Sequence, residues 1–211
     1  MYVPTAFRQD DLTIQHEAIR RCRLAILVDA GEAGLQASHI PVLLDAEAGP
    51  YGTLLGHFAR SNPQARLQAS QTETLVVFPG PDAYVSPGWY PSKQATGKAV
   101  PTWNYVAVHA YGRLEPIDEP AAKRAIVAAL SDRHEAGQPH PWRIEDAPDD
   151  FIAAQLAAIV AFRMPISRLE GKWKLSQNRP PEDQAAVATA LAAAGSPPET
   201  TVAAYMNGRP R

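Results

Sequence analysis

The chain has 211 residues, a formal net charge of −2 and a single cysteine, Cys22. This length suffices for one well-packed core, while the charge provides no broad basic field for DNA or an anionic membrane. A single cysteine excludes an internal disulfide and a cysteine-cluster metal site. No apolar run approaches the ~20 residues of a membrane span and the N-terminal residues lack a signal-peptide pattern, so we expect a cytoplasmic protein without membrane contact.

The first part of the chain is predicted to be a meander of short strands with two helices. A helix is expected over residues 11–22, capped by Asp10 or Asp11, with its buried stripe at Leu12, Ala18, Ile19 and Cys22. Strands are expected over residues 24–30, 35–45 and 53–60, separated by turns at 31–34 and 46–52. Residues 61–70 are predicted as a short helix, capped by Ser61 or Asn62, with Pro63 in its first turn. This arrangement favours a closed or nearly closed barrel.

The stretch from Leu75 to Leu114 is predicted to organise the fold as strand, turn, short strand, polar loop and long strand. In the long strand, one face is polar or aromatic and the other apolar: Trp103, Tyr105, His109 and Tyr111 alternate with Val106, Val108 and Ala110. The preceding segment is expected to be irregular because of its prolines, Pro81, Pro87, Pro91 and Pro101. Its rings, hydroxyls and amine suit a planar, polar-edged ligand, or simple packing at a barrel edge.

The second part is predicted to be mainly helical. A helix starts at Asp118-Glu119-Pro120, and a second over residues 149–162 buries Phe151, Ile152, Leu156 and Ile159. A strand over 161–171 and a helix over 182–194 follow, and the last residues are expected to fray or to pack on a partner subunit. Segregated helices and strands indicate the α+β class. We expect one domain over residues 1–194, with a helical insert at 118–161 and a tail at 195–211.

Three polar segments are candidates for binding. His39, in the apolar strand Ser38-His39-Ile40, is either a ligand contact or a hydrogen-bonded histidine at the barrel end. Arg60, before Ser61-Asn62-Pro63, suits a phosphate dianion or ordinary helix capping. The third segment, residues 172–179, is either a solvated cationic face or a binding edge.

Signals for catalysis, metals and nucleotide-binding loops are weak. Ser131, Asp132, His134 and Glu135 include the residue types of a catalytic triad, but they lie on one predicted helix, where surface ion pairing is expected. The six histidines show no metal-ligand spacing, and neither a Rossmann nor a P-loop glycine pattern is present.

Several long motifs resemble one known family. SHIPVLLD, GHFARSNPQ, FPGPDAYVSPGWYPSK, VPTWNYVAVHAYGRL, LSDRHE and EGKWKLSQNR together resemble the PaiB-type, FMN-binding negative transcriptional regulators, over roughly residues 1–190. The resemblance implies a split β-barrel similar to flavin reductases and pyridoxamine-phosphate oxidases. It further implies a homodimer with two FMN sites at the subunit interface.

The resemblance also implies a set of cofactor-binding residues. Arg60, Ser61 and Asn62 are expected near the FMN phosphate, with Lys93 or Thr102 as further donors. The ribityl chain and ring edge are expected to be lined by Ser38, His39, Ile40 and His57. The facing subunit is expected to contribute Trp103, Asn104, Lys172, Ser176 and Gln177.

Three activities remain open at this stage. The family implies transcriptional regulation, although the charge and the lack of a helix-turn-helix signature do not support direct DNA binding. A flavin-dependent oxidoreductase acting on a small molecule or haem is the alternative, with His39, His57 and His109 as acid–base candidates. A flavin-free structural dimer is the third.

Overall fold

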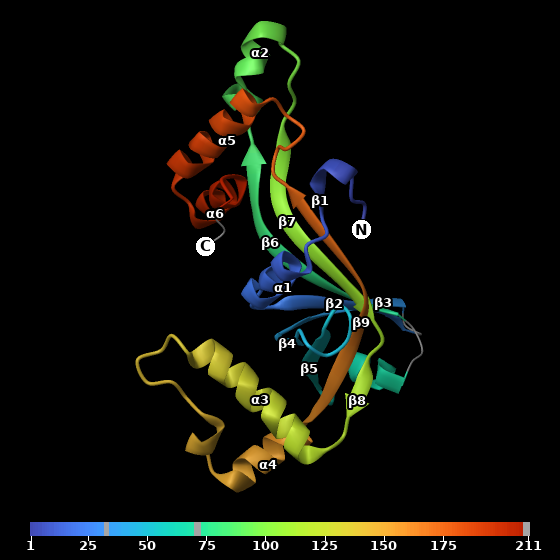
Figure 1. Ribbon diagram of the computed structural model, residues 1–211. Helices are drawn as coiled ribbons and strands as arrows, with labels where there is room; N and C mark the ends of the chain where they lie inside the picture. The colour runs from blue at the N-terminus through green and yellow to red at the C-terminus, as the bar shows by residue number, and fades with distance from the viewer. Residues whose placement is uncertain (32–33, 70–72, 209–211) are drawn as a thin grey trace. The chain divides into compact units, whose positions relative to one another are not determined.

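The computed structural model describes residues 1–31, 34–69 and 73–208, and it confirms the α+β class (Figure 1). The strands are β1 Arg8–Gln9, β2 Ala25–Gly31, β3 Gly34–Ile40, β4 Val42–Asp45, β5 Thr53–Ala59, β6 Thr74–Val85, β7 Thr102–Gly112, β8 Glu115–Ile117 and β9 Ile159–Lys174. The helices are α1 Leu12–Arg21, α2 Pro91–Thr96, α3 Pro120–Glu135, α4 Asp149–Ala157, α5 Pro181–Ala194 and α6 Pro197–Met206. The 3-10 helices are η1 Thr5–Phe7, η2 Pro63–Ala69, η3 Pro87–Trp89 and η4 Ile144–Asp146.

The chain forms two compact units, each assembled from separate stretches. Unit 1 comprises Met1–Ala18, Pro79–Val108 and Glu170–Arg211, and unit 2 comprises Ile19–Phe78 and His109–Leu169. Strands β6, β7 and β9 each contribute residues to both units. The predicted domain boundaries, 1–194 with an insert at 118–161 and a tail at 195–211, stay a prediction.

The two end strands of the sheet are neighbours in sequence. The strand order is β3-β2-β6-β7-β9-β5-β4, while β1 and β8 also pair with β9. β3 ends at Ile40 and β4 begins at Val42, so Pro41 joins the first strand of this path to the last. Proline cannot donate to a ladder, and it therefore ends β3 and separates it from β4. The single strand predicted over residues 35–45 is thus two strands, and the path of strands returns on itself as in a barrel.

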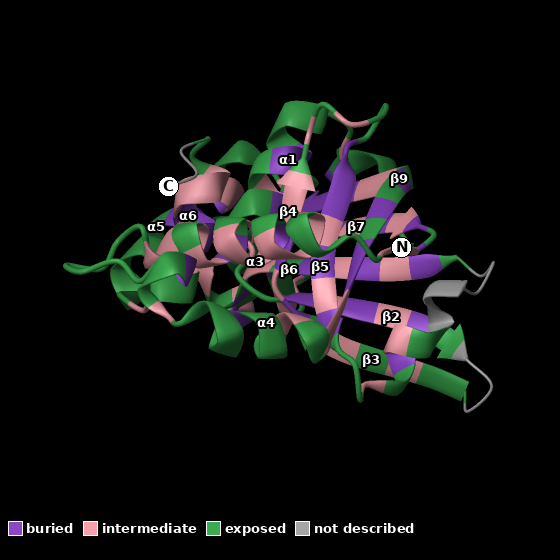
Figure 2. Cartoon of the chain, turned by 90° about the horizontal axis from the view of Figure 1, so that it is seen from below, coloured by how far each residue is buried: buried purple, intermediate pink, exposed green. Residues whose placement is uncertain are grey.

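Alternation along the strands places the core as the sequence predicted. In β7, Val106, Val108 and Ala110 are buried, while the residues between them are half-buried. The same alternation of buried and half-buried residues runs along β2 in Figure 2. In unit 2, Phe58 and Phe162 pack with their ring centroids 5.1 Å apart. Gly56 makes room for this pair, because a Cβ at Gly56 would lie 2.8 Å from the Phe162 ring.

The helices of unit 2 begin and pack largely as predicted. Glu119 caps α3 by accepting hydrogen bonds from the amides of Ala121 and Ala122, and Ile126 and Leu130 are buried against β4, β5 and β9 residues. In α4, Ile152 is buried but Phe151 is 53% exposed, so its predicted burial was wrong. α4 also ends at Ala157, earlier than predicted, because Ile159 already belongs to β9.

The C-terminal segment of unit 1 is more ordered than predicted. Residues 197–206 form α6, which lies beside α5 (Figure 1). Val187 and Leu191 of α5 and Val202 of α6 are fully buried. The expectation that this segment frays was therefore wrong, since its apolar residues pack on α5. Packing on a partner subunit stays a prediction.

Proline-rich residues 79–101 also differ from the expectation. β6 continues through Pro79 and Pro81 to Val85, and α2 begins at Pro91, where a missing amide hydrogen costs nothing. The buried positions of β6 change from even to odd numbers across this stretch, so the alternation shifts at the prolines without ending the strand.

Helix α1 agrees with the prediction in its cap but not in its buried face. Asp11 is the cap, as predicted. Leu12 is exposed, however, and Gln15 and His16 are buried together with Ile19.

Candidate functional site

Two of the predicted site residues in unit 2, Ser38 and Asn62, form a hydrogen-bond network with Gln64 of η2. The Asn62 Nδ2 donates to Ser38 Oγ at 2.8 Å, and Asn62 Oδ1 accepts from the Gln64 amide at 2.9 Å. The Ser38 hydroxyl in turn donates to Gln64 Oε1. Gln64 is 1% exposed, whereas Ser38 and Asn62 are half-buried, so the network runs from the interior of unit 2 to its surface. The structure thus brings Ser38 and Asn62 together, and their contact with a cofactor stays a prediction.

The guanidinium of Arg60 points to backbone carbonyls. Its Nε donates to the oxygen of Ala157 at 2.8 Å, and its Nη2 donates to that of Ile159 at 3.1 Å. Ala157 is the last residue of α4, where a cation is favourable, and Ile159 is the first residue of β9. Arg60 therefore joins the end of α4 to the start of β9, a contact that the sequence did not predict. Ser61 beside it is exposed.

The two histidines of the predicted site, His39 and His57, make none of the hydrogen bonds of the Ser38–Asn62 network. His39 is exposed on the outer side of β3, whereas Ile40 is buried. On β5, Gly56 and Phe58 face the core, and His57 instead lines a pocket beside α3. Burial lowers the pKa of His57, so its ring is neutral near pH 7.

In unit 1, Lys172 and Lys174 lie two residues apart on β9 and therefore share a face. Lys174 Nζ donates to Thr102 Oγ1 at 2.7 Å and to the Trp103 carbonyl. Lys172, 7% exposed, donates to the Tyr2 carbonyl at 3.0 Å, and its Nζ lies 5.2 Å from the centroid of the Tyr105 ring.

The charges at this end of β9 are of one sign. Burial lowers the pKa of Lys174, and the positive charges of Lys172 and Arg179 lower it further. Within the described residues, no carboxylate pairs with any of these three side chains. We call Lys172, Lys174 and Arg179 the cationic cluster. An anion would relieve its internal repulsion, so the cluster suits a phosphate or carboxylate.

The turn after β9 is held by predicted site residues. Asn104 is fully buried, and its amide lies 3.0 Å (Nδ2) and 3.1 Å (Oδ1) from Ser176 Oγ. Ser176 has a φ of +66°, a left-handed conformation that is unusual for serine. Gln177 supports this turn by accepting from the Leu175 amide and donating to the Trp173 carbonyl. Strain of this kind is concentrated at functional sites.

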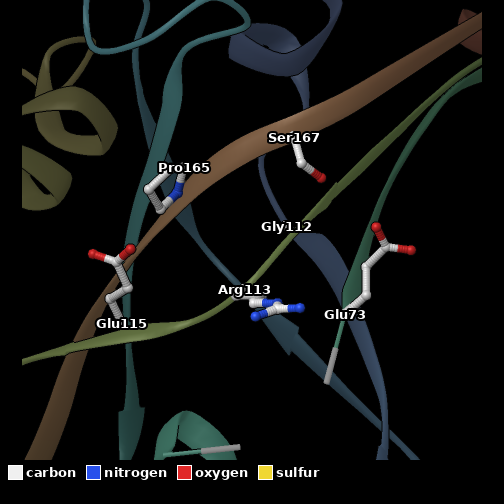
Figure 3. A pocket seen from close by; sticks show the side chains of 6 residues that line it. All are labelled: Glu73, Gly112, Arg113, Glu115, Pro165 and Ser167. Atoms are coloured by element: carbon white, nitrogen blue, oxygen red, sulfur yellow. The ribbon is translucent and has the colours of Figure 1, made fainter. Parts of the chain in front are cut away.

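A second pocket in unit 2, of about 350 Å³, contains no predicted site residue (Figure 3). Its lining consists of Glu73, Gly112, Arg113, Glu115, Pro165 and Ser167. Figure 3 shows Arg113 between Glu115 and Glu73 in this view. Both carboxylates already have ion pairs, Glu115 with Arg163 at 2.6 Å and Glu73 with Arg168 at 3.5 Å. Because both of its carboxylates are already paired, this pocket is a weaker candidate than the cationic cluster.

The comparisons with known proteins decide the family. A family model described as "Putative FMN-binding domain" matches residues 1–168. The chain belongs to this FMN-binding family. It is 33% identical to an uncharacterised protein of Aspergillus fumigatus, over 84% of this chain and 85% of that protein. It is 28% identical to the Bacillus subtilis protein named Protease synthase and sporulation protein PAI 2, over 85% of this chain and 83% of that protein, which confirms the predicted PaiB-type resemblance.

A solved structure shares the fold of this FMN-binding family member. The FAD and heme binding protein from Mycobacterium smegmatis superposes with a TM-score of 0.60, covering 90% of this chain and 80% of that one at 18% identity. At this identity the likeness shows the fold alone.

Among the described residues, no helix is both long and apolar enough to cross a membrane. Nor does the described part of the chain group three or more side chains that could hold a metal ion.

Sequence reasoning missed Gln64 and Asp29, but it had placed Lys174 and Arg179 in the candidate binding segment 172–179 without expecting them at the cofactor. In the structure both belong to the cationic cluster with Lys172. Gln64 and the buried Asp29 of β2 lie beside Ser38 and Asn62. Asp29 interrupts an apolar strand, and that interruption was its signal. Lys93 is exposed on α2, and its predicted role is untested.

Proposed function

We propose that this chain binds FMN as the cofactor of a PaiB-type flavoprotein, with the cationic cluster of unit 1 holding the phosphate. The observation that carries this proposal is the absence of a carboxylate partner for Lys172, Lys174 and Arg179 within the described residues. The positive charges of Lys172 and Arg179 lower the pKa of Lys174, and a bound dianion would offset this repulsion. Membership of the FMN-binding family supplies the identity of that dianion.

The donors in unit 1 fit a phosphate. Lys172 is fixed by the Tyr2 carbonyl and lies against the Tyr105 ring, and Lys174 is fixed by Thr102. Each ammonium has three N–H donors, so further hydrogen bonds remain available to a bound anion. In unit 2, two of the donors of Arg60 already bind the carbonyls of Ala157 and Ile159. The charge distribution therefore favours the cationic cluster over Arg60, Ser61 and Asn62 as the phosphate site.

The remaining predicted residues are proposed to contact the rest of the cofactor from two subunits of a homodimer. Ser38, His39, Ile40 and the Asn62 network would belong to one protomer, whereas His57 lines the pocket beside α3 and is not included. Trp103, Asn104, Ser176 and Gln177 would belong to its partner. The edge-to-face pair of Trp103 and Tyr84 supports such an interface, since these rings are 52% and 45% exposed.

Titration with two flavins tests the proposal, because riboflavin is FMN without its phosphate. The purified protein is expected to quench FMN fluorescence and to absorb between ~300 and ~550 nm when loaded. Lys172→Met and Lys174→Met should each raise the Kd for FMN roughly tenfold and leave riboflavin binding unchanged, since each removes one charged donor to phosphate. Lys98→Met, at an exposed lysine of the same unit, should change neither Kd.

The outcomes separate the parts of the proposal. A phosphate-specific loss in Arg60→Met, with the lysine variants unaffected, would move the phosphate to unit 2 and keep FMN binding. No binding of either flavin would overturn the assignment of a flavin cofactor.

The activity that FMN would support has two candidates. When bound, FMN supplies one-electron and two-electron transfer. The similarity to PAI 2 supports a regulatory role, whereas membership of the FMN-binding family is equally compatible with an oxidoreductase. Consumption of NAD(P)H with a cycling flavin spectrum would identify the enzyme. A shift of promoter DNA that weakens steeply with salt would identify direct regulation.

A further inference from the structure

The pocket beside α3 in unit 2 has features of a ligand site that the proposed FMN function does not use. It measures about 260 Å³ and lies between β5 and the Pro41 connection on one side and α3 and its following connection on the other. Its lining consists of Pro41, His57, Val127, Leu130, Ser131, His134, Glu135 and Trp142.

The walls of this pocket are held in place by specific contacts. Arg133 of α3 donates to the Val42 carbonyl at 2.8 Å, next to Pro41, and to the Cys22 carbonyl at 3.2 Å. The Trp142 amide donates to Glu135 Oε2 at 3.1 Å, which fixes the connection after α3 to the end of that helix. The pocket is therefore formed before a ligand arrives, which lowers the entropic cost of binding.

His57 supplies the polar group that orients a ligand. Its Nδ1 is buried and has no hydrogen-bond partner in the described part of the chain. A neutral imidazole carries its proton on one nitrogen, and an Nδ1–H without an acceptor would be costly, so the proton is expected on Nε2. His57 lines the pocket while its Nδ1 is buried, and it therefore offers an N–H donor there.

The other side chains narrow the class of ligand. Val127, Leu130 and Pro41 give an apolar surface, and the indole of Trp142, 40% exposed, gives a flat wall. The Glu135 carboxylate in the wall disfavours an anion. The volume suits a molecule of one or two rings rather than a dinucleotide or a haem.

We propose that this pocket binds a small, uncharged aromatic carbonyl compound, whose ring packs on Trp142 and whose carbonyl oxygen accepts a hydrogen bond from His57. The site is separate from the cationic cluster and does not depend on FMN. It would give the protein a second ligand, acting as a substrate or an effector.

Three fragments of one size test this class on the unaltered protein. Benzamide, toluene and benzoate share a ring, but only benzamide combines neutrality with a carbonyl acceptor. The indole N–H signals in an NMR titration report binding, and Trp142→Phe assigns the signal of Trp142. Benzamide is expected to shift that signal with a Kd on the order of 1 mM, as is usual for a fragment of this size. Toluene and benzoate should bind about tenfold more weakly.

A matched pair of variants tests the role of His57. His57→Phe keeps a flat ring without the donor and should weaken benzamide about tenfold, while His140→Phe, at an exposed histidine outside the pocket, should change nothing. Equal binding of benzamide and toluene, no saturation by 20-fold above the expected Kd of about 1 mM, or an unchanged Kd in His57→Phe would overturn the proposal. If His57→Phe does not fold, the fragment series alone decides.

Discussion

At the scale of single residues, the burial of the Asp29 carboxylate destabilises the folded state. Asp29 lies on β2, is 3% exposed, and neither carboxylate oxygen has a hydrogen-bond partner among the described residues. Burial raises the pKa of Asp29, and the nearby amide of Gln64 offsets only part of that rise. The unfolded chain therefore releases this proton at a lower pH than the folded chain does. Stability is expected to fall as the pH rises from about 4 through the raised value, and to stay low above it.

Asp29→Asn should remove this cost because asparagine does not ionise. The variant is expected to be more stable at pH 7 by on the order of 1 kcal/mol, because a buried charge costs more than a buried neutral amide, and the gain should shrink near pH 4. Urea denaturation at both pH values measures the effect. Asp82→Asn, at an exposed position of β6, is the control and should differ little from the parent protein. An Asp29→Asn protein of equal or lower stability at pH 7 would contradict this account.

At the scale of elements, Asp183 of α5 holds α2 in place. Its Oδ1 accepts from the Ser92 amide at 3.1 Å, and its Oδ2 accepts from the Ser92 hydroxyl at 2.7 Å. Asp183 is completely buried, and α2 is only six residues long, too short to persist on its own. A carboxylate at the start of a helix also interacts favourably with the helix dipole. The position of α2, and of Lys93 on it, therefore depends on this contact within unit 1.

Asp183→Ala is expected to destabilise the protein by roughly 2–3 kcal/mol, because it leaves two donors of the half-buried Ser92 without a charged acceptor. The neighbouring Glu182→Ala, at an exposed position, should cost less than about 0.5 kcal/mol. Chemical denaturation measures both values, and hydrogen exchange should show the amides of α2 losing protection in Asp183→Ala alone. Retained protection in that variant would show that α2 is held by other contacts.

The elements that could be predicted from the sequence are those with local signals. Local signals were reliable: Asp11 caps α1, Glu119-Pro120 starts α3, and alternation identified the core face of β7. The prolines were a less reliable signal: they were expected to make this stretch irregular, but Pro91 begins a helix and Pro79 lies within β6. An extended strand tolerates proline wherever its amide hydrogen is not needed, and the sequence does not show where that is.

Parts of the site depended on contacts between distant segments. Arg60 was predicted to face a ligand, but its partners are the carbonyls of Ala157 and Ile159, almost 100 residues further along the chain. Ser38 and Asn62 were predicted in one cofactor site, at different parts of FMN, and the hydrogen bond between them was not predicted. The buried position of Asp29 was not predicted, since it follows from η2 covering β2.

At the scale of the whole molecule, the proposed homodimer should respond to Trp103. If this exposed ring lies in the subunit interface, Trp103→Ala is expected to raise the dimer dissociation constant about 30-fold, which corresponds to the roughly 2 kcal/mol of an interface hot spot. Light scattering over a range of protein concentrations measures it. Trp142→Ala, at the exposed tryptophan of unit 2, is the matched control and should leave assembly unchanged. A parent protein that stays monomeric at micromolar concentration would contradict the dimer itself.

The threading of β9 through both units affects how the gene can be dissected. The region matched by the family model stops at residue 168, in the middle of β9. A truncation there would remove Gly171 and Lys172, the pairing partners of β1, together with Lys174, α5 and α6. Because β6 and β7 also serve both units, no single cut of the polypeptide yields either unit intact. Expression plasmids designed from the family boundary would therefore omit part of unit 1, and a segment meant for functional work should extend past α6.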